Sequence, residues 1–185
     1  MTPKIKMIAC AALAIGLTAP AEAQGPYAGE QASAVKALSA EDTRDLLEGR
    51  GMGLAKAAEL NRYPGPMHVL ELAGQLGLSD ADVAAVRRVF EAMRSEARAL
   101  GREIVVAEGK LDRLFALGPA DAAAVEALTT KIAALQGRLR AVHLKAHLAI
   151  RPMLASETVA RYDALRGYTG EGSRGHSPGA NTHRH

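Results

Sequence analysis

The chain has 185 residues, a net charge of +3 and an isoelectric point near 9.2, and only 3% of its residues are aromatic. This length allows one domain with tails. Arginines and glutamates alternate along the central stretch without an aromatic–basic platform, a pattern that argues against nucleic acid as a partner. Because the sequence has no nucleophile motif and no glycine-rich phosphate loop, we expect no enzyme.

Residues 1–23 have the pattern of a secretory signal peptide. A positively charged start and an apolar run of about 11 residues, Met7 to Leu17, precede a small-x-small cleavage site that ends at Ala23. The apolar run is too short to span a bilayer. We therefore expect export to the periplasm and a mature chain without disulfides, because the only cysteine, Cys10, lies in this leader.

The next segments predict an arm and several short helices. Residues 24–37 contain glycine and proline and predict a flexible arm. Ser39 is a suitable N-cap for a helix that starts at Ala40, and three glycines, Gly49, Gly51 and Gly53, should weaken or bend it. Pro66 then opens a short helix that ends at Gly77.

Two long helices dominate the sequence from Ser79 to Leu154. Apolar residues recur at alternating steps of three and four from Val83 to Leu114 and again from Val125 to Met153. This is the 3.5-residue period of a coiled-coil seam. The short break at Gly118-Pro119 favours antiparallel packing of the first helix, Asp80 to Leu117, on the second.

The resulting prediction is an all-α fold: an elongated antiparallel helical hairpin with short flanking helices, four to five helices in total. A thin seam of Ala, Leu and Val buries little area, so we also expect a dimer that shares the apolar stripe. A last short helix is predicted from Ser156 to Arg166. Residues 169–185 should form a disordered tail, which contains His176, His183 and His185.

One local pattern recurs at the helix starts. A leucine precedes a hydroxyl residue, and a polar residue follows three places later, which is typical of a capping box. The three copies begin at Leu38, Leu78 and Leu154, and they predict Ser39, Ser79 and Ser156 as caps.

These helix starts resemble the Leu-Thr-x-x-Gln segments of the periplasmic Spy/CpxP family, which includes zinc-associated relatives and heavy-metal sensors of the CnrX type. The resemblance covers about residues 38–168. The stretch Gly49 to Ala55, followed by Tyr63-Pro64-Gly65-Pro66, looks like a branch described as Spy/CpxP-like chaperones or metal sensors. In the copy at Leu78 a serine stands for the threonine and an aspartate for the glutamine.

The resemblance implies a hook-shaped protomer, an antiparallel dimer with a concave face, and two alternative functions. Spy-like members are ATP-independent chaperones that hold unfolded periplasmic proteins in envelope stress, and CpxP-like members damp a sensor kinase. CnrX-like members bind nickel or cobalt and signal to a membrane sensor protein. We therefore expect a chaperone-like stress protein that needs no cofactor or, alternatively, a sensor or resistance protein for a divalent transition metal (Ni, Co, Cu or Zn).

The candidate metal ligands are four residues on two predicted helices. His143 and His147 are four residues apart and share a helix face, so that both imidazoles could bind one ion. His68 and Glu71 could complete the site. Met52, Met67 and Glu59 are near in sequence, and thioethers suit copper or nickel better than magnesium. Two histidines packed at the edge of a helix are the alternative.

Client or partner binding would use charge and apolar surface. Arg87, Arg94 and Arg98 could line a positive concave face that attracts acidic clients, or they could be a solvated helix surface. Leu144 and Leu148 lie off the apolar stripe, so they either pack against another helix or form an exposed apolar patch. The tail histidines are a second place where metal could bind.

Overall fold

The computed structural model describes residue 25 and residues 27–169. Every regular element in this part of the chain is helical, which confirms the all-α prediction. The chain divides into two compact units between Gln31 and Ala32, and the α-helices described here belong to the second unit. The expected signal peptide and the tail histidines lie outside the described residues.

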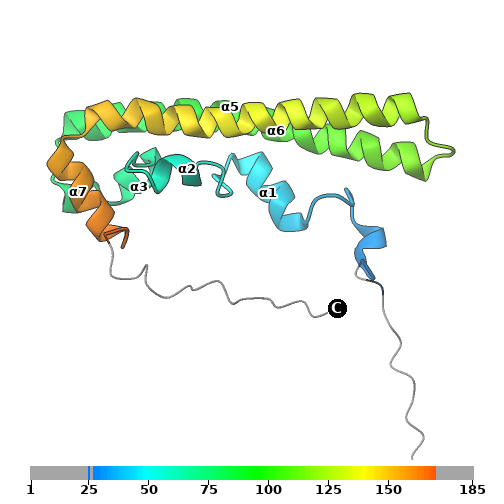
Figure 1. Ribbon diagram of the computed structural model, residues 1–185, viewed down its shortest axis with the longest axis horizontal. Helices are drawn as coiled ribbons and strands as arrows, with labels where there is room; N and C mark the ends of the chain where they lie inside the picture. The colour runs from blue at the N-terminus through cyan, green and yellow to red at the C-terminus, as the bar shows by residue number, and fades with distance from the viewer. Residues whose placement is uncertain (1–24, 26, 170–185) are drawn as a thin grey trace, which may run out of the picture. The chain divides into compact units, whose positions relative to one another are not determined.

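Two long helices form the predicted hairpin and lie side by side (Figure 1). Helix α5, Asp80–Ala116, has 37 residues and is therefore about 55 Å long. Helix α6, Ala122–Ile150, follows a short turn and starts at Asp121, whose side chain accepts a hydrogen bond from the Ala124 amide at 3.0 Å. The hairpin thus matches the sequence-based prediction within a residue or two at each end.

The buried side chains form two clusters along the hairpin. The first holds α5 and α6 together with helix α1, Ala40–Glu48, and consists of Leu46, Ala97, Leu100, Ile104, Ala107, Ile132, Leu135, Leu139 and Val142. The second lies where α7, Ser156–Leu165, packs at the other end, and consists of Val69, Leu76, Val86, Ile150, Leu154, Val159 and Tyr162. The 3.5-residue seam therefore supplies most of the core.

The predicted stripe departs from the structure at the end of α6. Ala149 and Met153 continue the strict 3.5-residue period but are exposed, whereas Ile150 is fully buried. A straight α-helix drifts by about 20° per heptad relative to that period, so the buried face moves on by one position. His143 and His147, which lie beside the predicted stripe, are also buried, and the loop between α2 and α3 covers His147.

Short helices flank the hairpin on one side, and α7 lies at the end away from the α5–α6 turn (Figure 1). After α1 come α2, Lys56–Glu59, α3, Pro66–Glu71, and α4, Ala73–Leu76. Two 3₁₀ turns complete the elements: η1, Glu30–Ala32, and η2, Arg151–Met153. Five of the α-helices have six or more residues and two have four, which agrees with the predicted four to five helices.

Two of the three predicted caps are confirmed. The hydroxyls of Ser39 and Ser79 each accept a hydrogen bond from the backbone N–H of the aspartate three residues later. The carboxylate of that aspartate in turn accepts a hydrogen bond from the backbone N–H of the serine. The prediction for Ser156 is wrong: Ala155 occupies the N-cap position of α7 and makes no side-chain bond. The chain enters α7 one residue earlier, so the hydroxyl residue stands inside the first turn and cannot cap.

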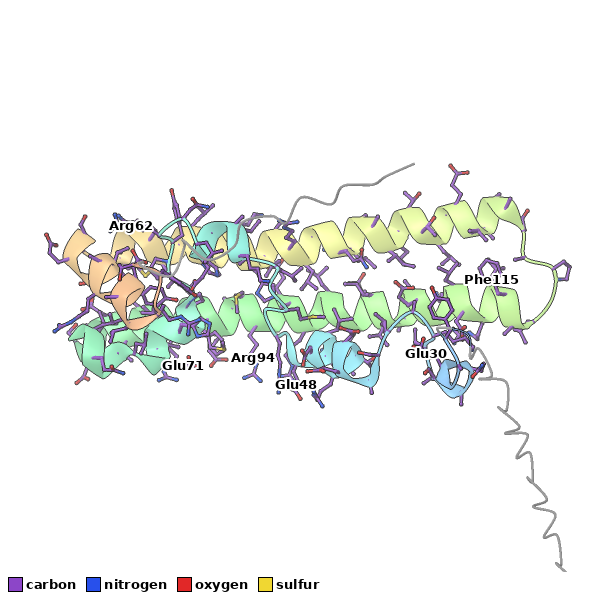
Figure 2. The ribbon with its side chains drawn as sticks, turned by 60° about the horizontal axis from the view of Figure 1, so that its bottom comes forward. Glu30, Glu48, Arg62, Glu71, Arg94 and Phe115 are labelled. Carbon is purple, nitrogen blue, oxygen red and sulfur yellow. The ribbon has the colours of Figure 1, made fainter. Side chains whose placement is uncertain are left out.

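The end of α1 is fixed against α5 by backbone contacts. Gly49 adopts a left-handed conformation (φ 67°) that ends the helix. Arg94 and Arg98 donate hydrogen bonds from Nε to the carbonyl oxygens of Glu48 and Leu47, both at 3.2 Å, and Glu48 and Arg94 lie beside each other in Figure 2. These bonds satisfy carbonyls that the helix leaves without partners.

Over the described part of the chain, none of the helices combines the length and the apolar character needed to cross a membrane.

Candidate metal centre

A cavity of about 700 Å³ lies between the hairpin and the chain from Glu48 to His68. Side chains from α5, α6, α3 and the residues after α7 contribute to its wall. Three histidines and three methionines are among them: His68, His143, His147, Met52, Met67 and Met93. The cavity therefore brings together nitrogen and thioether donors that lie far apart in the sequence.

His147 is buried and its imidazole has a defined tautomer. Its Nδ1 lies 2.7 Å from the backbone carbonyl oxygen of Tyr63. A carbonyl only accepts hydrogen bonds, so Nδ1 carries the proton and Nε2 carries the lone pair of the neutral ring. Metal-binding histidines are usually oriented by such a bond from their other nitrogen. Gly65 borders the Cε1–Nε2 edge, where a side chain would find little room.

His143 lies one turn before His147 and is only 3% exposed. Its Nε2 is buried and has no hydrogen-bond partner. Burial, with a contribution from the charge of His147, lowers the pKa of His143. The imidazole therefore stays neutral at neutral pH, the state in which it can bind a cation. An unsatisfied buried nitrogen is costly, and a ligand would remove that cost.

His68 pairs with the fourth predicted residue. Its Nδ1 lies 2.9 Å from Oε2 of Glu71, one turn further along α3. Glu71 does not line the cavity, whereas His68 does. The carboxylate therefore occupies Nδ1 and leaves Nε2 of His68 as the nitrogen available to a ligand. Glu71 is better described as a residue that orients an imidazole than as a direct ligand.

Glu59 is the centre of a hydrogen-bond network behind the histidines. Its Oε1 accepts bonds from the hydroxyls of Tyr162 at 2.5 Å and Tyr168 at 3.0 Å, and its Oε2 accepts from the Gly65 amide at 3.0 Å. Burial and the bond to Glu59 raise the pKa of Tyr162 well above its ordinary value. The same carboxylate lies 3.7 Å from Nδ1 of His147. The network joins the cavity to α7, and sequence spacing could not reveal it because its members are about 100 residues apart.

A second contact ties α7 to the same region. Arg62 donates from Nε to the buried carboxylate of Asp163 at 3.0 Å, and it lies at the α7 end of the molecule in Figure 2. Arg62 is one of two non-glycine residues with a left-handed backbone, at φ 68°, in the described part of the chain. The loop between α2 and α3 is therefore held from both sides, by Glu59 and by Arg62.

The methionines differ in depth. Met93 comes from the seam of α5 and is partly buried, whereas Met52 and Met67 are 40% and 44% exposed at the rim. Met52 is the other left-handed non-glycine residue, with φ 45°. Such a conformation costs on the order of 1–3 kcal/mol in a residue with a side chain. The sequence-based prediction did not include Met93 among the candidate metal ligands, because its heptad position assigned it to the core.

The four predicted metal ligands do not form a closed site on their own. In the described part of the chain, no group of three or more His, Cys, Asp or Glu residues is placed to hold a metal ion. A metal in this cavity would therefore need a donor of another kind, and the thioethers are the donors that the cavity offers. Metal binding by His143, His147, His68 and Glu71 stays a prediction.

The predicted client-binding residues have separate roles in the structure. Arg94 and Arg98 hold the carbonyls at the end of α1, while Arg87 is exposed. Leu144 is partly buried, and Leu148 is 57% exposed. Client binding by these residues stays a prediction.

Together, the fold and the cavity define an all-α protein with a helical hairpin and a cavity lined by buried histidines and by methionines that are partly exposed. Its sequence belongs to the heavy-metal resistance family, whose model matches residues 51–161. This family is related to the Spy/CpxP-like helical fold, and membership in Spy/CpxP itself stays a prediction. No curated protein and no solved structure matches the chain.

Proposed function

We propose that the protein binds a transition-metal ion in this cavity and acts in heavy-metal resistance as a sensor or buffer in the periplasm. One observation carries the proposal: His143 and His147 line the cavity from adjacent turns of α6, and the buried Nε2 of His143 has no partner. The Tyr63 carbonyl orients the second ring so that its Nε2 lone pair is available. The family match supports the same function.

The chain's own residues prepare the site in two ways. Burial keeps His143 neutral, so a cation need not displace a proton from it at neutral pH. Hydrogen bonds from Nδ1 to Tyr63 and Glu71 hold the rings of His147 and His68 in fixed tautomers, which reduces the ordering that binding would require.

The test is calorimetric titration of the full chain with Ni(II), Zn(II) and Cu(II), and with Ag(I) as a soft ion. The starting protein should have Cys10 replaced by serine and His176, His183 and His185 replaced by alanine, so that neither the thiol nor the tail can bind metal. We expect at least one ion to bind with one-to-one stoichiometry. In this background, His143→Ala and His147→Ala should each weaken binding by about tenfold or more, because each removes a donor.

Lys145→Ala is the matched control, because Lys145 lies on the same helix between the two histidines and is exposed. It should leave the affinity unchanged. A flat titration with all four ions, or binding that survives both histidine substitutions, would contradict the proposal.

A chaperone activity toward unfolded periplasmic proteins, a membrane sensor as partner and a homodimer stay predictions. The first is supported by exposed apolar side chains. Leu148 is exposed on α6, and Phe115, 60% exposed, lies near the turn of the hairpin (Figure 2). Leu117, which is 84% exposed, is the C-cap residue of α5.

A further inference from the structure

We propose that the cavity selects a soft monovalent cation, Cu(I) or Ag(I), because the thioethers of Met52, Met67 and Met93 add soft donors to the imidazole nitrogens of His143 and His147. This inference rests on the proposed function, because it names the ion for the same site.

The first argument is the type of donor. Three of the six methionines of the chain line this one cavity, and the only other described methionine, Met153, lies outside it. Thioether sulfur is a soft and uncharged donor that favours Cu(I) over harder divalent ions. The His, Cys, Asp and Glu side chains alone do not form a three-residue cluster that could hold a metal ion anywhere in the described part of the chain. Thioethers are therefore the donors that can complete the set begun by His143.

The second argument is charge. Two acidic and four basic side chains line the cavity: Glu48, Glu59, Arg50, Lys56, Arg94 and Arg166. Both carboxylates are already engaged, Glu48 with Arg50 at 2.8 Å and Glu59 with two tyrosine hydroxyls. A divalent ion would meet twice the repulsion that this excess of positive charge exerts on a monovalent ion, without a free carboxylate to offset it.

The third argument is the position of Met52. Its left-handed backbone, between Gly51 and Gly53, is a strained conformation for a residue with a side chain. The glycine-rich turn places this residue in the wall of the cavity, where it is 40% exposed to solvent. Large apolar side chains usually gain by burial, so a strained and exposed methionine in the wall of the cavity that also holds the unsatisfied imidazole indicates a role for the thioether.

The experiment compares Ag(I), and Cu(I) without oxygen, with Ni(II) and Zn(II), using the full chain with Cys10 replaced by serine and the three tail histidines replaced by alanine. Affinities come from competition with chelators, and NMR of ¹³C-methyl-labelled methionines shows which thioethers are contacted. We expect Ag(I) and Cu(I) to bind at least about 100-fold more tightly than the divalent ions. The methyl signals of Met52, Met67 and Met93 should shift on addition of Ag(I).

Each of these methionines is then replaced by leucine, which nearly preserves volume and apolar character. Met52→Leu, Met67→Leu and Met93→Leu should each lower the Ag(I) affinity by about tenfold, with helical circular dichroism unchanged. Met153→Leu is the matched control and should bind as the parent does, because Met153 is exposed outside the cavity.

Two results overturn the inference in distinguishable ways. If Ni(II) or Zn(II) binds at His143 at least as tightly as Ag(I), or if Ag(I) shifts Met153 as strongly as the cavity methionines, the choice of ion is wrong while the proposed function stands. If none of the ions binds the tail-substituted protein, both the inference and the proposed function fail.

Discussion

Replacement of Gly65 by alanine should separate metal binding from folding. The added Cβ would lie 3.0 Å from Cε1 and 3.2 Å from Nε2 of His147, and 3.3 Å from Oε2 of Glu59. These contacts are a few tenths of an ångström too short, so the imidazole must shift. The backbone of Gly65, at φ −81° and ψ 140°, suits alanine equally well. We therefore expect a loss of about 1–3 kcal/mol in unfolding free energy, which is typical of overpacking in a buried region.

The same methyl group would stand beside the nitrogen that carries the lone pair of His147. Metal affinity should fall by about tenfold, because an oriented ligand ring has been displaced. Urea unfolding measures the first effect and chelator competition the second. Gly74→Ala is the control, since nothing lies within 4 Å of its added Cβ, and it should preserve affinity. If Gly65→Ala binds metal as tightly as the parent protein, His147 Nε2 is not a ligand and the argument is refuted.

Two further predictions concern the scaffold and its response to acid. At Gly101 an added Cβ would overlap a backbone carbonyl of α1, so Gly101→Ala should destabilise the protein by about 1–3 kcal/mol. Gly137→Ala places its methyl group in open space on a helix and should stabilise the protein by about 1 kcal/mol. If urea unfolding shows that both substitutions change the unfolding free energy in the same direction, the packing of α1 on α5 is contradicted. The second prediction follows from the lowered pKa of His143: below the ordinary value of 6.5 the unfolded chain takes up a proton that the folded chain resists. Stability should therefore fall as the pH drops from about 7.5 to 5.5, and His143→Gln should reduce that fall. An identical pH dependence in the two proteins would show that His143 does not cause it.

Local patterns predicted the helices well and the details of their ends less well. The capping boxes at Ser39 and Ser79 depend only on neighbouring residues, and both are present. The third was misplaced because Ser156 and Ala155 differ by one position, and the packing of α7 decides where the helix begins. Likewise, the strict seam predicted Ala149 as buried, whereas the drift of a straight helix buries Ile150.

The candidate site was predicted in part. The spacing of His143 and His147 places both rings on one face, and both line the cavity. The spacing could not show that a carbonyl of the α2–α3 loop orients one ring while the other nitrogen lacks a partner. Nor could it assign Met93 to the cavity, because the same heptad position serves equally well in a core.

The sequence by itself determined the helical hairpin, because period, caps and turn residues act over a few neighbouring positions and all agree. Only the tertiary structure decided which donors meet. The segment from α1 to α3 packs on the hairpin and is held by Glu59, Arg62 and Arg94. Met52 and Met67 of this segment therefore line the same cavity as His143 and His147 of α6. Such contacts depend on how several elements pack at once, and sequence periodicity contains no information about them.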